Sequence, residues 1–568
     1  HSTQAPHMMQ SALAKHLGLE ETDVRVICHD VGGSYGIKVH VYPDEVAAAA
    51  ISKIMGRPIK FIADRLESFL SDIHARDHEI DGRMALDSDG RILALEIDDL
   101  TGIGPYSVYP RTSAVEGNQV VGLCGGPYDI DAYRARTTVV MQNKCPTSQY
   151  RAVGHPIACA VTEGLVDLAA EALDLDPVEF RRRNLVPDDA YPYTSAAGMR
   201  FEGLSHHKSL QKLLDMMDYD GLRNEQARLR EQGIYRGIGI ASFIELTNPS
   251  PFMYGIGGAR ISAQDGCTVR MDPDGSVTAL SGVTEQGQGT EAMLRQVVAE
   301  AVGVAVDSVR VKTGDTQVTP YGGGTWASRG TGIGGEAALQ AGLALRENIL
   351  VIAAAMLQSS PDALDLASGS VVDKQTGEER LSLAEIGRIV YFRGDTLPKD
   401  LPRELSVTRH YIASEYPFAF TNGVQASYLE VDTATGFVKL LKHWCVEDCG
   451  RVVNPMLVDE QIRGGIIQGI GGALLEECLY DEQGQLTNAN MADYLVPMAA
   501  EMPDIVVGHV ETPTLESALG AKGAGEAGTA GAPGAVMNAI NDAIRPLGGR
   551  VTDMPFTPEK ILRALNAF

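Results

Sequence analysis

The segment Lys522-Gly523-Ala524-Gly525-Glu526-Ala527-Gly528 places one carboxylate among glycines and alanines, and a helix is expected to follow it. Such small neighbours let a carboxylate lie close to a bound group, with little else nearby. In a pocket of low polarity its pKa rises, and it can then act as a base near neutral pH. From these residues alone, Glu526 is either a catalytic base or an ordinary exposed loop carboxylate.

The same segment matches G-x-G-x-x-G, the pattern of dinucleotide-binding loops, at Gly523, Gly525 and Gly528. In the Rossmann fold this loop follows a hydrophobic strand and opens a βαβ unit. Residues 516–521 (Glu-Ser-Ala-Leu-Gly-Ala) do not form such a strand, and too little chain follows for a complete unit. A nicotinamide-dependent dehydrogenase is therefore disfavoured.

Several segments in the second half of the chain repeat one order, in which a glycine-rich loop leads into a helix. These loops are 284–289, 321–330, 447–455 and 522–528. Backbone N–H groups at a helix start attract anions, and glycine lets the backbone approach a ligand closely. A single loop of this kind is often only a turn, but several together predict a large ligand with phosphates and many polar atoms.

Residue periodicity predicts the elements around these loops. Strands are expected at 24–28, 59–62 and 438–446, and hairpins at 79–97 and 268–280. Helices are expected at 45–55, after 156, within 205–235, after 289, from about 336, through 462–470 and at 533–544. We place the main division of the chain in the polar, helical stretch 205–235.

Composition narrows the class of function. The length of 568 residues predicts three or four domains or subdomains. A net charge of -26 disfavours nucleic acid as a partner, because an acidic surface repels phosphate backbones. The eight cysteines form no CxxC pair and no zinc-type or iron–sulfur ligand set, which indicates reduced thiols in a cytoplasmic protein. No apolar run reaches the roughly 18 residues of a membrane span.

An ordered set of motifs carries a family resemblance. The set comprises Ser2-Thr3-Gln4-Ala5-Pro6-His7, Gly32-Gly33-Ser34-Tyr35-Gly36, Gln149-Tyr150-Arg151-Ala152-Val153-Gly154-His155-Pro156, the stretch 176–184, the loops at 285–289, 325–331 and 448–469, and Gly525-Glu526. Over essentially the whole chain, it resembles the molybdenum-cofactor-binding subunit of the xanthine dehydrogenase and aldehyde oxidase family, the molybdenum hydroxylases.

The resemblance implies an α+β protein with two large mixed α/β domains, each made of subdomains, that bind a molybdenum cofactor at their interface. The expected boundaries are 1–205 for the first domain, 206–235 for a helical connector and 236–568 for the second domain. Large subunits of the family begin with a smaller preceding domain. His1 is therefore expected to be an internal start or the start of a separated piece.

Residue roles follow from the resemblance, position by position. Glu526 matches the family's catalytic base, Gln4 the glutamine that hydrogen-bonds an oxo ligand of molybdenum, and Arg151 the arginine of the substrate loop. The expected cofactor-binding residues are Gly33, Ser34, Tyr35, Gly36, Gln286, Gly287, Gln288, Ala327, Ser328, Arg329, Thr331, Gln461 and Gly525. No side chain is expected to bind molybdenum itself, because the dithiolene of the pterin holds it.

The expected substrate pocket contains Tyr150, Val153, His155 and Val39. Ala152 stands where carbon monoxide dehydrogenases have a cysteine, which disfavours carbon monoxide as the substrate. Val39 and Val153 stand where xanthine enzymes have a glutamate and a substrate-stacking phenylalanine, which disfavours purines. His155 either reaches the pocket or packs within its loop. The shape of the pocket also depends on the segment 243–258.

The chemistry implied is oxidative hydroxylation of an electron-poor carbon in an N-heteroaromatic compound, with water as the oxygen source. The expected cofactor is molybdopterin cytosine dinucleotide, with oxo, sulfido and hydroxo ligands on molybdenum, and Glu526 is expected to take the hydroxo proton. Electrons are expected to leave through an iron–sulfur small subunit with 2Fe-2S clusters and a medium subunit with FAD, in a cytoplasmic dimer of heterotrimers. An aldehyde oxidoreductase of the same family and a non-catalytic cofactor-binding subunit remain as alternatives.

Overall fold

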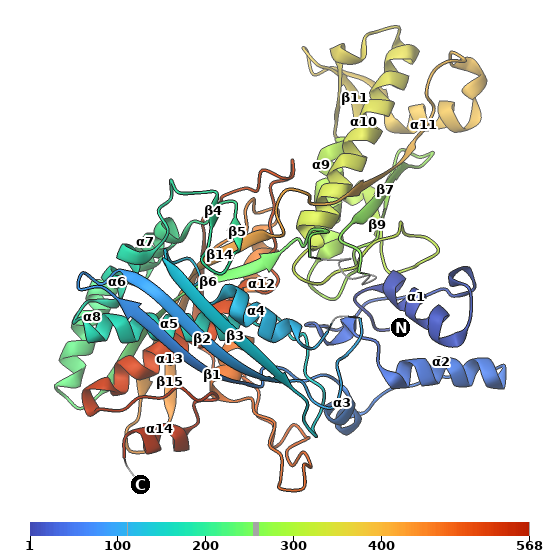
Figure 1. The fold of residues 1–568 in the computed structure, drawn as a ribbon. Coiled ribbons are helices and arrows are strands. Elements are labelled where there is room, and N and C mark those ends of the chain that lie inside the picture. Colours follow the sequence, from blue (N-terminus) through green and yellow to red (C-terminus); the bar gives the residue numbers. More distant parts are fainter. Residues whose placement is uncertain (111, 254–260, 567–568) are drawn as a thin grey trace.

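The computed structural model describes residues 1–110, 112–253 and 261–566. Within these residues, the strands form three main sheets and two small ones, with helices packed between and around them (Figure 1). The mixed helix-and-sheet class expected from the sequence is confirmed.

The helices and strands have the following bounds. The helices are α1 (Pro6–Leu17), α2 (Pro43–Met55), α3 (Arg65–Ser71), α4 (Val115–Leu123), α5 (His155–Ala172), α6 (Pro177–Asn184), α7 (His206–Met217), α8 (Tyr219–Arg230), α9 (Thr290–Val302), α10 (Glu336–Leu357), α11 (Leu383–Phe392), α12 (Pro455–Leu474), α13 (Ala527–Ile544) and α14 (Pro558–Ala564). The strands are β1 (His78–Leu86), β2 (Ile92–Gly102), β3 (Ala132–Val140), β4 (Tyr193–Thr194), β5 (Arg200–Phe201), β6 (Tyr235–Thr247), β7 (Asp265–Met271), β8 (Val277–Ser281), β9 (Val309–Lys312), β10 (Leu364–Ala367), β11 (Ser370–Asp373), β12 (Glu379–Ser382), β13 (Ser406–Tyr411), β14 (Ala419–Val431), β15 (Val438–Asp448) and β16 (Asp504–His509).

The central sheet has the strand order β16-β15-β14-β6 and is covered on both faces. Alternate residues of a strand point to opposite faces, so β6 contributes to two cores. Phe243 joins the core made with α12 and α13, whereas Ile244 joins the core that contains α7. Gly239 faces α13, and a Cβ there would collide with the carbonyl oxygen of Ala535. The helix therefore packs on the strand backbone itself, and this contact positions residue 526 at the start of α13.

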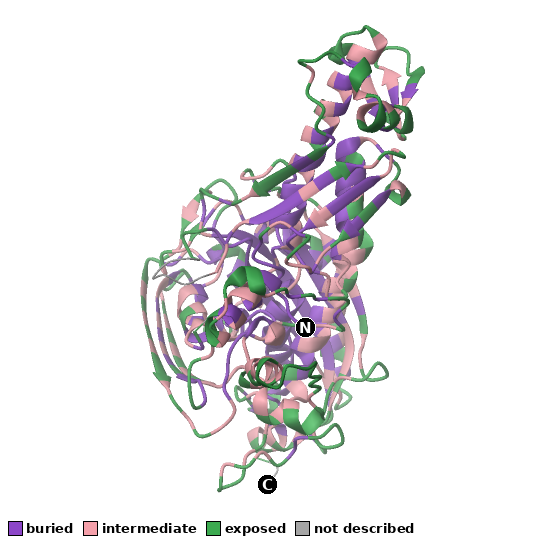
Figure 2. Cartoon of the chain, turned by 90° about the vertical axis from the view of Figure 1, so that its right-hand side faces the viewer, coloured by how far each residue is buried: buried purple, intermediate pink, exposed green. Residues whose placement is uncertain are grey.

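Two further sheets flank the central one. The sheet β1-β2-β3 packs against α4 and α5, and the sheet β13-β7-β8-β9 packs against α9 and α10. The small sheet β10-β11-β12 and α11 form a projection at the top of Figure 1. Figure 2 shows that this projection is largely exposed or half-buried, whereas the buried residues are concentrated in the body of the molecule. The two predicted hairpins are confirmed as β1–β2 and β7–β8.

Two predicted strands are wrong. Of residues 24–28, only Ile27 forms a bridge, to Asp315, because the opposing chain at 314–316 turns away instead of continuing as a strand. Residues 59–62 have no regular structure, and Ile62 is 72% exposed. A short apolar run becomes a strand only where a partner strand is available to complete its hydrogen bonds.

The start predicted for the last long helix before the C-terminus is also wrong, since α13 begins at Ala527 and contains Pro533 in its interior. Proline cannot donate the N–H that would reach the carbonyl of Thr529. This helix is held by packing on α12, where a Cβ at Gly469 would meet Thr529 O at 3.2 Å. Tertiary contact thus outweighs the local cost of the proline. The other expected helices are present.

One helix among the described residues, Gly330–Leu357, is long and apolar enough by length and composition to cross a membrane. The charged residues Glu336, Arg346 and Glu347 lie within it. Its side chains Leu345 and Ile349 are fully buried in the core against the sheet β13-β7-β8-β9.

A buried ion pair joins α5, α6 and β6. The guanidinium of Arg181 is fully buried and donates to Glu163 Oε2 (2.6 Å), Asp167 Oδ1 (2.7 Å) and the carbonyl oxygen of Ile240 (2.8 Å). Removal of one partner from such a pair leaves a buried charge without compensation.

We therefore expect Arg181→Ala to lower the free energy of unfolding by about 3–5 kcal/mol. Arg183→Ala on the same helix is the control, because its pair with Glu179 is about half exposed and should contribute less than about 1 kcal/mol. Urea unfolding followed by circular dichroism measures both. Equal effects of the two substitutions would contradict a structural role for the buried pair.

Candidate active site

The segment around Glu526 is fixed by its own backbone. The carbonyl oxygen of Glu526 accepts hydrogen bonds from the N–H groups of Thr529 (3.1 Å) and Ala530 (3.2 Å), so this residue opens α13. Its own N–H donates to Oε1 of Glu245 on β6 (3.2 Å). The Glu526 side chain is partly exposed, while the flanking residue Ala527 is buried.

The glycines of this segment allow close contact between protein segments. A Cβ at Gly523 would collide with the carbonyl oxygen of Ser328, and a Cβ at Gly525 would meet Ser328 Oγ at 2.8 Å. A Cβ at Gly528 would collide with the carbonyl oxygen of Ile462 on α12. Packing between loops and helices thus explains the G-x-G-x-x-G pattern, without a nicotinamide dinucleotide in a Rossmann fold.

Arg151 ties the 149–156 loop to the Glu526 segment. Its guanidinium, only 7% exposed, donates to the carbonyl oxygens of Gly525 (2.5 Å) and Gln461 (2.9 Å), and to Gln468 Oε1 (3.1 Å). Burial lowers the pKa of Arg151, whereas nearby Tyr150 and Glu526 raise it. The planar fork of an arginine suits several acceptors in fixed directions. The structure therefore brings Arg151, Gln461, Gly525 and Glu526 together.

Gln4 connects two other predicted loops. Its carboxamide is buried, with Nε2 donating to the carbonyl oxygen of Thr325 (3.0 Å) and Oε1 accepting from the N–H of Gly36 (3.1 Å). Gly36 has a φ of 103°, and a Cβ there would collide with the carbonyl oxygen of Gln149. The carbonyl oxygen of Tyr35 accepts from the N–H of Arg151 (2.8 Å). Loop 33–36 thus lies between Gln4 and Arg151.

The 284–289 loop is organised by a residue that sequence reasoning missed. The carboxylate of Glu285 accepts from the N–H groups of Gly287 (2.8 Å), Gly289 (3.1 Å) and Glu291 (2.9 Å), and so it caps the start of α9. An acidic side chain of the protein thus complements the positive end of this helix. The predicted ligands Gln286 and Gln288 bond mainly within the same loop and to Thr325.

In the 325–331 loop, Ala327 and Ser328 both adopt the left-handed backbone region (φ of 49° and 51°). Ser328 Oγ donates to Oε1 of Glu245. Arg329, another predicted cofactor ligand, is fully buried and donates to the carbonyl oxygens of Ser262 (2.6 Å) and Gln264 (2.7 Å). Thr331 lies in the turn Gly330–Gly335 that leads into α10.

The predicted substrate-pocket residues have different packing environments. Tyr150 packs under Arg76, and burial raises its pKa to about 12, so the phenol is neutral. Val153 is buried in the turn before α5, and Val39 packs with Ala5 and Trp326 in a small apolar cluster.

His155 is buried at the start of α5, where its Nε2 accepts from the N–H of Leu246 (3.4 Å). This placement favours the packing alternative for that side chain. Of the segment 243–258, residues up to 247 belong to β6, and 254–258 lie outside the described residues.

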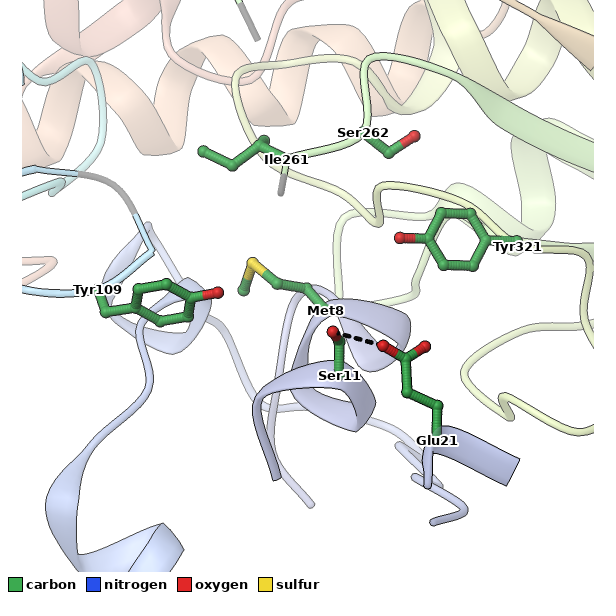
Figure 3. Close-up of a pocket in the computed structure, with 7 residues that line it drawn as sticks. All are labelled: Met8, Ser11, Glu21, Tyr109, Ile261, Ser262 and Tyr321. Atoms are coloured by element: carbon green, nitrogen blue, oxygen red, sulfur yellow. Dashed lines mark hydrogen bonds between the residues drawn. The ribbon is translucent and has the colours of Figure 1, made fainter. Parts of the chain in front are cut away.

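A separate cavity of about 260 Å³ lies beside α1 (Figure 3). Its lining residues are Met8, Ser11, Glu21, Tyr109, Ile261, Ser262 and Tyr321. None of them is a predicted site residue, so this cavity does not mark the arrangement around Glu526.

The loops around Glu526 fit a large polar cofactor. Ser34 Oγ is buried and has no hydrogen-bond partner among the described residues. A polar group of a bound ligand can therefore supply the hydrogen bond that this hydroxyl lacks. A Cβ at Gly32 would meet no atom within 4 Å, which leaves open space beside this loop. No group of three or more His, Cys, Asp or Glu side chains in the described part of the chain could hold a metal ion.

Comparison with known proteins identifies the family. Family models described as molybdopterin cofactor-binding domain match residues 1–185 and 212–503. The nicotine 6-hydroxylase large subunit of Paenarthrobacter nicotinovorans is 37% identical over 564 residues, which cover 99% of this chain and 69% of that protein. The carbon monoxide dehydrogenase large chain of Hydrogenophaga pseudoflava is 31% identical over 571 residues, covering 100% and 70%.

A solved structure agrees with these relatives. Quinoline 2-oxidoreductase from Pseudomonas putida 86 superposes with a TM-score of 0.93 at 34% identity, covering 100% of this chain and 72% of that chain. The expected family, the fold with two cofactor-binding domains and the enzyme class are confirmed. The chain belongs to the molybdenum hydroxylase family of xanthine dehydrogenase and aldehyde oxidase, as the molybdenum-cofactor-binding catalytic subunit of an oxidoreductase.

Proposed function

We propose that Glu526 is the catalytic base of this enzyme and that Gln4 and Arg151 stabilise the polar transition state beside it. The observation that supports this most is a series of hydrogen bonds between segments distant in sequence. Gln4 accepts from the N–H of Gly36, and the carbonyl oxygen of the preceding Tyr35 accepts from the N–H of Arg151. The guanidinium of Arg151 in turn donates to the carbonyl oxygen of Gly525. General bases and preorganised donors of this kind act when held at fixed positions around the reacting atoms.

The proposed cofactor is molybdopterin cytosine dinucleotide, held by the loops 33–36, 286–288, 327–331 and by Gln461 and Gly525. When bound, it supplies the redox centre that takes two electrons from the substrate. Glu526 takes the proton from the water-derived oxygen nucleophile as this attacks an electron-poor carbon. Arg151 holds the Gly525 carbonyl and so orients the neighbouring base. The cofactor lies at the interface between the proposed domains 1–205 and 236–568, with 206–235 as the connector.

An N-heteroaromatic compound is the proposed substrate class. Two of the relatives are named for such compounds, nicotine and quinoline, and they share 37% and 34% of their aligned residues with this chain. Ala152, where carbon monoxide dehydrogenases have a cysteine, argues against carbon monoxide. Val39 and Val153 argue against a purine. Tyr150, Val153 and Val39 remain proposed determinants of the pocket, whereas the buried position of His155 favours a packing role.

The relatives are large subunits of multi-subunit enzymes. For this chain we propose an iron–sulfur partner with 2Fe-2S clusters and an FAD-binding partner, in a cytoplasmic dimer of heterotrimers. The eight cysteines of this chain are free thiols and contain no iron–sulfur ligand set, which is consistent with clusters held elsewhere.

The role of Glu526 can be tested by Glu526→Gln. We expect turnover to fall at least about a hundredfold, because glutamine cannot accept the proton, while molybdenum content stays unchanged. Steady-state kinetics with a dye acceptor and metal analysis measure the two quantities. Glu511→Gln is the control, since this exposed carboxylate precedes the same segment. A Glu526→Gln enzyme with wild-type turnover would refute the assignment.

A substrate panel tests the proposed class. With the intact complex, we expect kcat/KM for N-heteroaromatic compounds to exceed that for aldehydes by at least about tenfold, a difference of roughly 1.4 kcal/mol in transition-state stabilisation. The opposite order would favour the aldehyde oxidoreductase alternative.

The cofactor can be identified by its hydrolysis products. Acid hydrolysis of the purified complex is expected to release CMP in an amount equal to the molybdenum content. Molybdenum without CMP would contradict the cytosine dinucleotide form.

A further inference from the structure

Glu245 is a fully buried carboxyl group in a strand that is otherwise apolar or uncharged from residue 237 to 247. It lies on β6 two residues after Phe243, so its side chain is on the face of the sheet that packs against α13. Burial of an acidic side chain in a central sheet is costly unless the group is hydrogen-bonded or uncharged. A specific role is therefore expected for this residue.

The carboxyl group of Glu245 joins two loops of the active site to the strand. Its Oε1 accepts from Ser328 Oγ and from the N–H of Glu526 (3.2 Å). Its Oε2 is buried and has no hydrogen-bond partner among the described residues. The group thus contacts the backbone of the proposed base directly, and one of its oxygens remains available to carry a proton.

The charges around Glu245 disfavour a second anion. Glu526 and Glu447, the latter on β15, repel a negative charge on Glu245. The cation Arg151 interacts electrostatically with both Glu245 and Glu526. His155 lies against the adjacent residue of the strand. If Glu245 is neutral, Arg151 and an ionised Glu526 balance each other. If both carboxyls are ionised, one of the two negative charges is left without a balancing cation, and the charge of Glu245 is fully buried.

We propose that Glu245 is the neutral, protonated member of a pair of interacting carboxyls, and that as a positioning residue it holds the backbone of Glu526 and leaves the negative charge on that residue. This inference rests on the proposed role of Glu526 as the base. Two carboxyls that interact electrostatically titrate as a pair, and the proton is favoured on the more buried group. Burial first, and then the charge of Glu526, raise the pKa of Glu245 well above its ordinary value.

The pair has a defined consequence for stability. A carboxyl with a raised pKa in the folded protein keeps its proton there, whereas the unfolded chain releases it near the ordinary value. The folded state then binds more protons, so stability is greatest at low pH and falls as the pH rises toward the raised pKa. Glutamine at this position would be neutral at every pH and would not show this loss.

The test compares wild type, Glu245→Gln and Glu300→Gln in the cofactor-loaded complex by thermal unfolding from about pH 5 to about pH 8. We expect the unfolding temperature of Glu245→Gln to rise relative to wild type as the pH increases. Glu300→Gln, an exposed carboxylate on α9, should follow wild type throughout. A difference between Glu245→Gln and wild type that stays constant or shrinks with rising pH would show an ionised Glu245 and overturn the proposal.

Kinetics of the same complexes test the positioning role. The Oε1 of glutamine can accept the same two hydrogen bonds, so Glu245→Gln should retain kcat within about threefold, while Glu245→Ala should lose about tenfold in kcat with an unchanged KM. Equal losses in both variants would overturn the positioning role. Glu526→Gln is measured in parallel. If this variant stays active, the proposed base is wrong. If it is inactive but the pH dependence or the kinetics of the Glu245 variants contradict the expectation, only the role of Glu245 is refuted.

Discussion

The close contact between α13 and β6 is the constraint on which the rest of the active site depends. Gly239 lets the helix backbone lie on the strand, and the start of that helix carries Glu526. A side chain at this glycine would move the helix, and with it the residue that the loops surround. The position of the proposed base is therefore set by the packing of backbone against backbone in the core, rather than by the loop in which it lies.

Around this contact, the loops are joined to one another by buried polar side chains. Arg151 binds carbonyl oxygens of two segments, and Gln4 uses both ends of its carboxamide to connect two more. Burial of each of these polar groups costs the free energy of its hydration. Hydrogen bonds within the protein offset that desolvation cost only if all of the partners stay in place. The ordering of the loops is consequently cooperative, because each loop depends on contacts with the others. The cofactor would therefore bind to loops that are largely preorganised.

Much of the fold could be predicted from the sequence, because turn residues and periodic apolar residues mark most helices and both long hairpins. The failures have physical causes. Residues 24–28 and 59–62 have the pattern of strands but lack partner strands, and Pro533 suggested a helix start that packing on α12 overrides. The motifs predicted which loops meet. They did not single out Glu285, although its contacts are local, with the N–H groups of residues 287, 289 and 291. They could not show Glu245, whose partners Ser328 and Glu526 are distant in sequence; its carboxylate within the apolar stretch of β6 was the one available sign.

The order of the central sheet leaves β6 at its edge, where unpaired backbone groups can recruit a strand from another molecule. Here side chains occupy that edge. Arg181 and Asn538 donate to the carbonyl oxygen of Ile240, and Asp542 accepts from the N–H of Ile238. Because these two backbone groups of β6 are already bonded, this part of the strand is less available for pairing with a neighbouring copy. The buried arginine that joins α5, α6 and β6 thus also helps to protect this part of the sheet edge against strand addition.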